Sequence, residues 1–263
     1  MMFLVSFLSC SKDTATNSVA GDEPSTNYAE YAERAFQTLQ TVYWDESRTI
    51  FYANNTRNTN VNYWWQAHAM DALVDASNRV QDDRYFSLIA AQYNGVKNAN
   101  HGYGNDYYDD MAWMGSALVR AYELTKVDEY LNTAIFLWHD IKTGWNDNQG
   151  GGIAWNKNQL DYKNTPSNAS TAILCCRLYN VTNEKKYLTL GENIMNWLQN
   201  VLVDKPTGMV WDGIGRNGGT SIDKGWLFTY NQGIYIGACA ELYNITNEAA
   251  WCERAIKTAD NAM

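Results

Sequence analysis

The chain has 263 residues, of which 46% are hydrophobic and only 3 are proline, so it can bury a sizeable core. Its formal net charge of −9 argues against a nucleic-acid partner, because the phosphates of nucleic acids require a basic protein face.

The N-terminus carries a segment that is typical of export. Residues 1–9 are almost wholly apolar, yet they are far fewer than the roughly 20 residues of a membrane span, so they favour a secretory signal. Phe7-Leu8-Ser9-Cys10 is similar to a bacterial lipobox, although an ordinary signal with an incidental cysteine is the alternative. We expect a signal segment at 1–10, a flexible tether at 11–26 and one domain at 27–263. A lipid anchor at Cys10 would hold the protein at the bacterial cell envelope, on the surface or in the periplasm.

Apolar residues at helical spacing predict nine helices, so the expected fold class is all-α. Strand signals are minor: glycine-punctuated stretches at 150–155 and 208–213 predict short hairpins in long loops. The predicted helices span residues 27–43, 62–80, 83–99, 108–126, 128–142, 165–182, 184–202, 230–246 and 248–263.

A helical hairpin recurs along the chain. In each copy a Tyr is followed three residues later by Thr, and an aromatic residue follows five residues after the Thr. The copies are Tyr122-Thr125-Tyr130, Tyr179-Thr182-Tyr187 and Tyr243-Thr246-Trp251. The predicted helices at 62–80, 108–126, 165–182 and 230–246 are rich in small residues, which let helix backbones approach closely. The helices between them carry bulky amphipathic stripes, and this alternation predicts a double ring of helices, an α/α toroid.

The cysteines and histidines do not predict a metal site. The sequence has no Cys-x-x-Cys pair, and its three histidines are scattered. Cys175, Cys176 and Cys239 lie in apolar helical stretches and are expected to pack as small hydrophobic residues. We therefore expect neither a metal nor another cofactor.

Each predicted inner helix begins with a cluster of polar or aromatic residues, at 62–68, 106–113, 164–168 and 230–233. Inner helices of a toroid run parallel, so the four clusters would converge at one mouth. Helix capping explains any one cluster alone. The convergence of Trp, His, Gln, Asn and two Asp instead favours a concave carbohydrate-binding site.

Two adjacent aspartates, Asp109 and Asp110, stand where the loop at 101–104 gives way to a helix. Two carboxylates that flank one bond are the minimal equipment for cleaving a glycosidic linkage. For an isolated Asp-Asp pair, the simpler interpretation is that one Asp caps the helix and the other interacts favourably with the positive end of the helix dipole. The surrounding clusters favour a catalytic pair.

The ordered motifs resemble glycoside hydrolase family 76, the bacterial endo-α-1,6-mannanases, from about residue 28 to the end. They are Tyr63-Trp-Trp-Gln-Ala-His68 with Asp71, Tyr108-Asp-Asp-Met-Ala-Trp113, Gly150-Gly-Gly-Ile-Ala-Trp-Asn156, Ser167-Asn-Ala-Ser170 and Thr229-Tyr-Asn-Gln-Gly-Ile-Tyr-Ile-Gly-Ala238. The resemblance implies an (α/α)6 toroid of twelve helices. Because nine are predicted, we expect an incomplete toroid that lacks about three helices at its C-terminus.

The resemblance also implies a retaining hydrolase of α-1,6-mannosidic bonds in neutral mannan, with Asp109 as nucleophile and Asp110 as acid/base. We expect a monomer. Together with the aromatic clusters, the resemblance predicts sugar contacts from Trp64, Trp65, Gln66, His68, Tyr108, Trp113, Asn168, Tyr230, Asn231 and Gln232.

Three other functions stay open at this point. A lyase or unsaturated-uronide hydrolase on anionic sugars would need Arg and Lys in the cleft, and the starts of the inner helices carry none. A sugar-binding lipoprotein without activity would not need paired carboxylates, although a truncated and inactive copy could retain them. A transglycosylase on the same scaffold cannot be distinguished from a hydrolase by sequence.

Overall fold

The structure, a computed structural model, describes residues 27–80 and 83–262. Within these residues the nine predicted helices are confirmed, and the all-α class with them. Only the first prediction needs adjustment, because its last five residues, Leu39–Tyr43, form a π-helix. The α-helices are α1 Tyr28–Thr38, α2 Tyr63–Val80, α3 Asp83–Ala99, α4 Tyr108–Thr125, α5 Asp128–Lys142, α6 Thr165–Thr182, α7 Lys185–Val201, α8 Thr229–Thr246 and α9 Ala249–Ala262.

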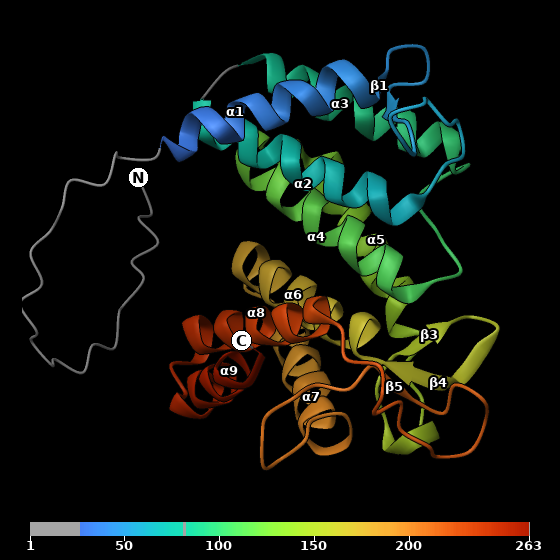
Figure 1. Cartoon of the computed structure of the whole chain (residues 1–263), viewed down its shortest axis with the longest axis vertical. Helices are drawn as coiled ribbons and strands as arrows, with labels where there is room; N and C mark the ends of the chain where they lie inside the picture. Colours follow the sequence, from blue (N-terminus) through green and yellow to red (C-terminus); the bar gives the residue numbers. More distant parts are fainter. Residues whose placement is uncertain (1–26, 81–82, 263) are drawn as a thin grey trace, which may run out of the picture.

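The helices form an open arc of hairpins (Figure 1). The inner helices α2, α4, α6 and α8 pack side by side in that order, and each also packs against the outer helix that follows it in the chain. Small residues permit the close approach: a Cβ on Gly115 of α4 would lie only 2.9 Å from the Leu174 side chain of α6. The fold is an incomplete α/α toroid, as predicted, and the inner helices all begin at the same end of the arc (Figure 1).

The recurring Thr is explained by the turns between helices. After each Thr comes one left-handed residue, whose N–H donates to the carbonyl oxygen of the Tyr. The Thr hydroxyl donates to the carbonyl four residues earlier and accepts the N–H two residues later. This left-handed cap ends the helix without leaving its last carbonyls unpaired. The left-handed residues are Lys126, Asn183 and Asn247.

Two small sheets hold the loops. Strands β1 Trp44–Asp45 and β2 Ile50–Phe51 form an antiparallel pair, and β3 Ala154–Asn156, β4 Gln159–Asn164 and β5 Gly213–Ile214 form a three-stranded antiparallel sheet. The hairpin expected near 150–155 exists, but it is built from β3 and β4 and lies a few residues further along. The segment at 208–213 forms a short antiparallel hairpin with residues 202–204 before β5. Val203 bridges to Val210, and on either side Asp204 N–H donates to the carbonyl oxygen of Met209 and Trp211 N–H to that of Leu202, both at 2.8 Å.

Cys175, Cys176 and Cys239 are buried free thiols in the inner helices, which confirms that they pack as small hydrophobic residues. No helix in the described part of the chain is long and apolar enough to cross a membrane. The predicted signal segment, the tether and Cys10 lie outside the described residues.

Candidate active site

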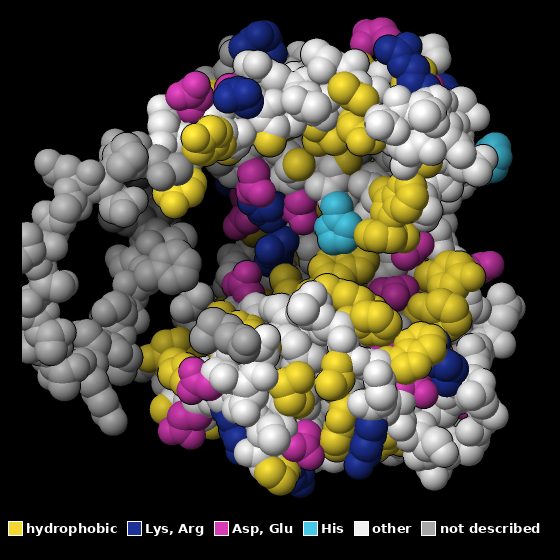
Figure 2. Space-filling view, in the orientation of Figure 1, with side chains coloured by type: hydrophobic (Ala, Val, Ile, Leu, Met, Phe, Trp, Pro, Cys, Tyr) yellow, Lys and Arg dark blue, Asp and Glu magenta, His cyan; other side chains and the backbone are white. Residues whose placement is uncertain are grey.

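The beginnings of all four inner helices, together with the β3–β4 hairpin, surround a cavity of about 890 Å³. In Figure 2 it belongs to a hollow that crosses the face of the molecule, with hydrophobic, acidic and basic side chains and a histidine on its walls. The convergence of the four helix starts at one mouth is therefore confirmed. The lining residues are Asn62, Trp64, His68, Tyr107, Asp109, Asp110, Trp113, Trp155, Pro166, Tyr230, Gly233 and Ile234.

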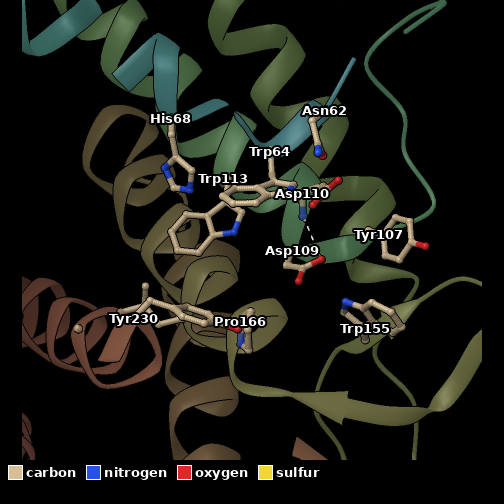
Figure 3. Close-up of a pocket in the computed structure, with 12 residues that line it drawn as sticks. Asn62, Trp64, His68, Tyr107, Asp109, Asp110, Trp113, Trp155, Pro166 and Tyr230 are labelled. Carbon is tan, nitrogen blue, oxygen red and sulfur yellow. Dashed lines mark hydrogen bonds between the residues drawn. The ribbon is translucent and has the colours of Figure 1, made fainter. Parts of the chain in front are cut away.

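Asp109 and Asp110 lie in the first turn of α4, and both line the cavity (Figure 3). Tyr107 occupies the N-cap position and makes no side-chain cap, so neither aspartate is the capping residue. Asp109 Oδ1 instead accepts the backbone N–H of Asp110 at 3.1 Å. Neighbouring side chains on a regular helix diverge by about 100°, and here the two still reach one cavity from the helix start.

The two carboxyl groups have different electrostatic environments. Burial raises the pKa of Asp109 to about 6, but hydrogen bonds from the backbone amides of Asp110 and Asp109 and from Asn164 and Trp155 act in the opposite direction. Burial and then the charge of Asp109 raise the pKa of Asp110 to about 7, and no neighbour lowers it. Hydrogen bonds to a carboxylate stabilise its ionised form. Asp109 is thus the better carboxylate and Asp110 the better acid.

One wall of the cavity is built from rings of α2 and α4 (Figure 3). The ring centroids of Trp64 and His68 are 5.7 Å apart, and those of His68 and Trp113 are 5.0 Å apart. Burial lowers the pKa of His68 more strongly than Asp71 raises it. The imidazole is therefore neutral at pH 7, and it can donate one hydrogen bond and accept another.

The opposite wall comes from the loop before α4 and from β3. The ring centroids of Tyr107 and Trp155 are 5.0 Å apart, and Tyr107 forms a backbone bridge with Asn156. The buried Lys163 ties down this hairpin, because its Nζ donates to the carbonyl oxygens of Gly152 at 2.8 Å and Gly144 at 3.3 Å. Burial lowers the pKa of Lys163 to about 8.

Three amides that were expected to contact sugar hydroxyls hold loops instead. Gln66, Asn168 and Gln232 occupy the fourth position of α2, α6 and α8, and all three are buried. In each amide the side-chain oxygen accepts the backbone N–H of one residue and the side-chain nitrogen donates to the carbonyl oxygen of the same residue. These partners are Phe51, Ile153 and Val210 respectively. Both ends of each amide are therefore committed to the backbone. The expectation that these three amides contact sugar is therefore corrected: they support the loops around the cavity and are not part of its lining.

Three further predicted contacts also lie outside the cavity lining. Tyr108 is buried, and its hydroxyl is 3.3 Å from Thr143 Oγ1. Asn231 is buried and donates to Asp212 Oδ1 at 2.9 Å. Trp65 is 37% exposed and packs edge-on against Trp64. Of the predicted site residues, the structure brings together Trp64, His68, Asp109, Asp110, Trp113 and Tyr230.

Six residues that line the cavity were not among the predicted sugar contacts, although each lies in or beside a motif named above. Asn62 directly precedes the Tyr63 motif, Tyr107 directly precedes Tyr108, and Trp155 ends the glycine-rich stretch. Pro166 and Gly233 lie within the clusters at 164–168 and 230–233, and Ile234 follows directly, but none of the three was among the predicted sugar contacts. None of the residues that line this cavity is Arg or Lys. Among the described residues, no group of three or more His, Cys, Asp or Glu side chains could hold a metal ion.

Comparison with known proteins points to one family. The sequence model of glycosyl hydrolase family 76 matches residues 21–263. Among curated proteins, the chain is 30% identical over 217 residues to the mannan endo-1,6-alpha-mannosidase DCW1 of Candida glabrata. The match covers 73% of this chain and 48% of that protein. The chain thus spans about half the length of the curated relatives it matches.

Solved structures agree with this match. The α-1,6-mannanase GH76A of Salegentibacter sp. HEL1_6 is 37% identical, with a TM-score of 0.87 over 89% of this chain and 70% of that one. An inactive variant of that enzyme, with two consecutive aspartates replaced by alanine, was solved in complex with α-1,6-mannotetrose. The Lin0763 protein of Listeria innocua is 41% identical, with a TM-score of 0.83 over 89% of this chain and 69% of that one.

Proposed function

The chain belongs to glycosyl hydrolase family 76, and we propose that it cleaves internal α-1,6-mannosidic bonds of neutral mannan chains with retention of configuration. The observation that carries the proposal is the carboxyl pair Asp109 and Asp110, which lines an aromatic cavity without Arg or Lys. Such a lining suits a neutral sugar better than an anionic one.

The comparisons support the same substrate. Two of the relatives with 30% identity or more are named as a mannan endo-1,6-alpha-mannosidase and as an α-1,6-mannanase. The variant with two consecutive aspartates replaced is called inactive, and its complex holds an α-1,6-linked mannose oligosaccharide. In this chain the adjacent aspartates of the cavity are Asp109 and Asp110.

In the first step, Asp109 attacks the anomeric carbon as that carbon's bond to the leaving oxygen breaks, and Asp110 gives its proton to that oxygen. In the second step, Asp110 takes a proton from water, the water oxygen attacks the anomeric carbon, and Asp109 is released. The hydrogen bonds around Asp109 favour the ionised nucleophile. The burial of Asp110 beside that charge favours the protonated acid.

The substrate is tested by incubating the purified chain with unbranched α-1,6-mannan and following product length. The proposal expects oligosaccharides of intermediate length to form first, which is the sign of internal cleavage. Polygalacturonate, an anionic polymer, is the control and should stay intact. Cleavage of polygalacturonate without cleavage of mannan would contradict the proposal.

The two raised pKa values predict the pH dependence of kcat/KM. Asp109 must be ionised, so activity rises as the pH passes its pKa of about 6. Asp110 must be protonated, so activity falls as the pH passes its pKa of about 7. The expected profile is a narrow bell with its maximum between these values, and its two apparent pKa values belong to the coupled pair. A profile without an alkaline limb would contradict the role of Asp110.

We also infer a lipid anchor at Cys10 that holds the protein at the bacterial cell envelope. The inference is supported by the lipobox-like Phe7-Leu8-Ser9-Cys10 and by the polar stretch that follows it. Cells grown with a labelled fatty acid should incorporate the label into the protein, and Cys10→Ser should abolish incorporation. Equal labelling of the variant would show that Cys10 is not the anchor.

A further inference from the structure

A strip of exposed aromatic rings leads away from the cavity. Tyr230, which lines the cavity, stacks on Phe228 with ring centroids 5.4 Å apart. Phe228 in turn meets Trp226 edge-on at 5.9 Å. Trp226, Phe228 and Tyr230 are 50%, 38% and 48% exposed, so each ring presents a large area to solvent. Trp226 and Phe228 also line a second hollow of about 320 Å³.

The strip is held in place by charged groups beneath it. The guanidinium of Arg216 lies 4.1 Å from the ring centroid of Trp226 and 4.6 Å from that of Tyr162. Arg216 is fixed in turn by Asp223, at 2.8 Å from its Nε, and by the buried Asp212. A cation against one ring face stabilises the position of that ring. Trp226 is therefore held on one side and exposed on the other, although it lies outside any helix or strand.

Packing in the hydrophobic core does not explain why these rings lie together, because all three are exposed on the surface. Large apolar rings left together on a surface mark a place where another molecule binds. The two carboxylate partners of Arg216 more than offset its positive charge, so the strip offers apolar ring faces above a group with no excess of positive charge. The face of an aromatic ring is electron-rich, and it can therefore contact the weakly positive C–H groups on the apolar face of a sugar.

We propose that Trp226 and Phe228 form a further sugar-binding subsite outside the cavity. It holds mannose units of the mannan molecule whose scissile bond lies between Asp109 and Asp110. The subsite rests on the proposed function. Its path is continuous, because Tyr230 belongs both to the cavity lining and to the strip. The consequence is that the affinity for mannose oligosaccharides continues to increase when they are longer than the cavity alone can hold.

The test is calorimetric binding of α-1,6-mannose oligosaccharides, from the disaccharide to the hexasaccharide, to a chain that carries Asp109→Asn and so does not consume them. Adding Trp226→Ala should weaken binding of the longest oligosaccharide about threefold to tenfold, the contribution of one aromatic contact. The disaccharide should lose less. Trp226→Phe keeps a ring and should restore part of the loss.

Phe136→Ala is the matched control, because Phe136 is an aromatic residue of the outer helix α5 with a similar exposure of 53%. The chain that carries Asp109→Asn and Phe136→Ala should bind every oligosaccharide as tightly as the Asp109→Asn parent does. If Trp226→Ala had no effect, or weakened all lengths equally, the subsite would be overturned while the proposed function stood. If the parent bound no mannose oligosaccharide of any length, the proposed function itself would fail.

Discussion

Asp109→Asn is expected to stop turnover of every substrate, with kcat lower by about 10⁴-fold or more. The amide is a poor nucleophile, so no glycosyl-enzyme forms, whatever the leaving group. The structure gives the physical basis for this assignment, because backbone amides and the side chains of Asn164 and Trp155 stabilise negative charge on Asp109. Hydrolysis of mannan and of an activated aryl mannoside should be lost together.

Asp106→Asn is the matched control for this substitution. Asp106 belongs to the loop just before α4, and its side chain is exposed and does not line the cavity. The same chemical change there should leave kcat near that of the parent, with an unchanged thermal midpoint for both variants. If Asp109→Asn kept activity close to that of Asp106→Asn, the nucleophile would have been assigned to the wrong residue.

Asp110→Asn is expected to lower kcat on mannan by about 10²- to 10⁴-fold, the usual contribution of a positioned general acid. The loss should be much smaller in the first step with an aryl mannoside whose phenol is a good leaving group, because such a group needs little protonation. A burst of released phenol would then precede slow turnover, since the second step still lacks its base. The alkaline limb of the pH profile should also disappear.

The two variants are distinguished by comparing the substrates. Asp109→Asn should lose both activities, while Asp110→Asn should lose mannan hydrolysis and retain phenol release. The opposite pattern, in which Asp109→Asn alone retains phenol release, would exchange the two roles. Equal losses on both substrates for both variants would contradict a division of labour between the two carboxyl groups.

The hairpins could be predicted because their signals are local. The Thr hydroxyl bonds backbone groups on both sides of each left-handed turn, so Thr recurs at a fixed place in the hairpin, as Thr182 shows. The common mouth followed from the parallel inner helices. The role of Asn168 could not be read in this way, because a polar residue at a helix start fits a ligand contact and a loop support equally well.

Contacts between distant segments explain the remaining misses. Trp155 reaches the cavity only because its hairpin bridges to Tyr107 and is held by Asn168 and Lys163. The strip at Trp226 depends on Arg216, ten residues earlier in the chain, which in turn needs the buried Asp212. The fourth position of the inner helices did carry a repeated signal, since three of the four have an amide there.

The most direct measurement is the anomeric configuration of the first product, followed by proton NMR while the chain hydrolyses unbranched α-1,6-mannan. A nucleophile at Asp109 and an acid/base at Asp110 predict that the new reducing ends appear first as the α anomer and only later equilibrate. First appearance of the β anomer would show single-step inversion and contradict the glycosyl-enzyme at Asp109. Absence of any new reducing end would contradict the proposed activity as a whole.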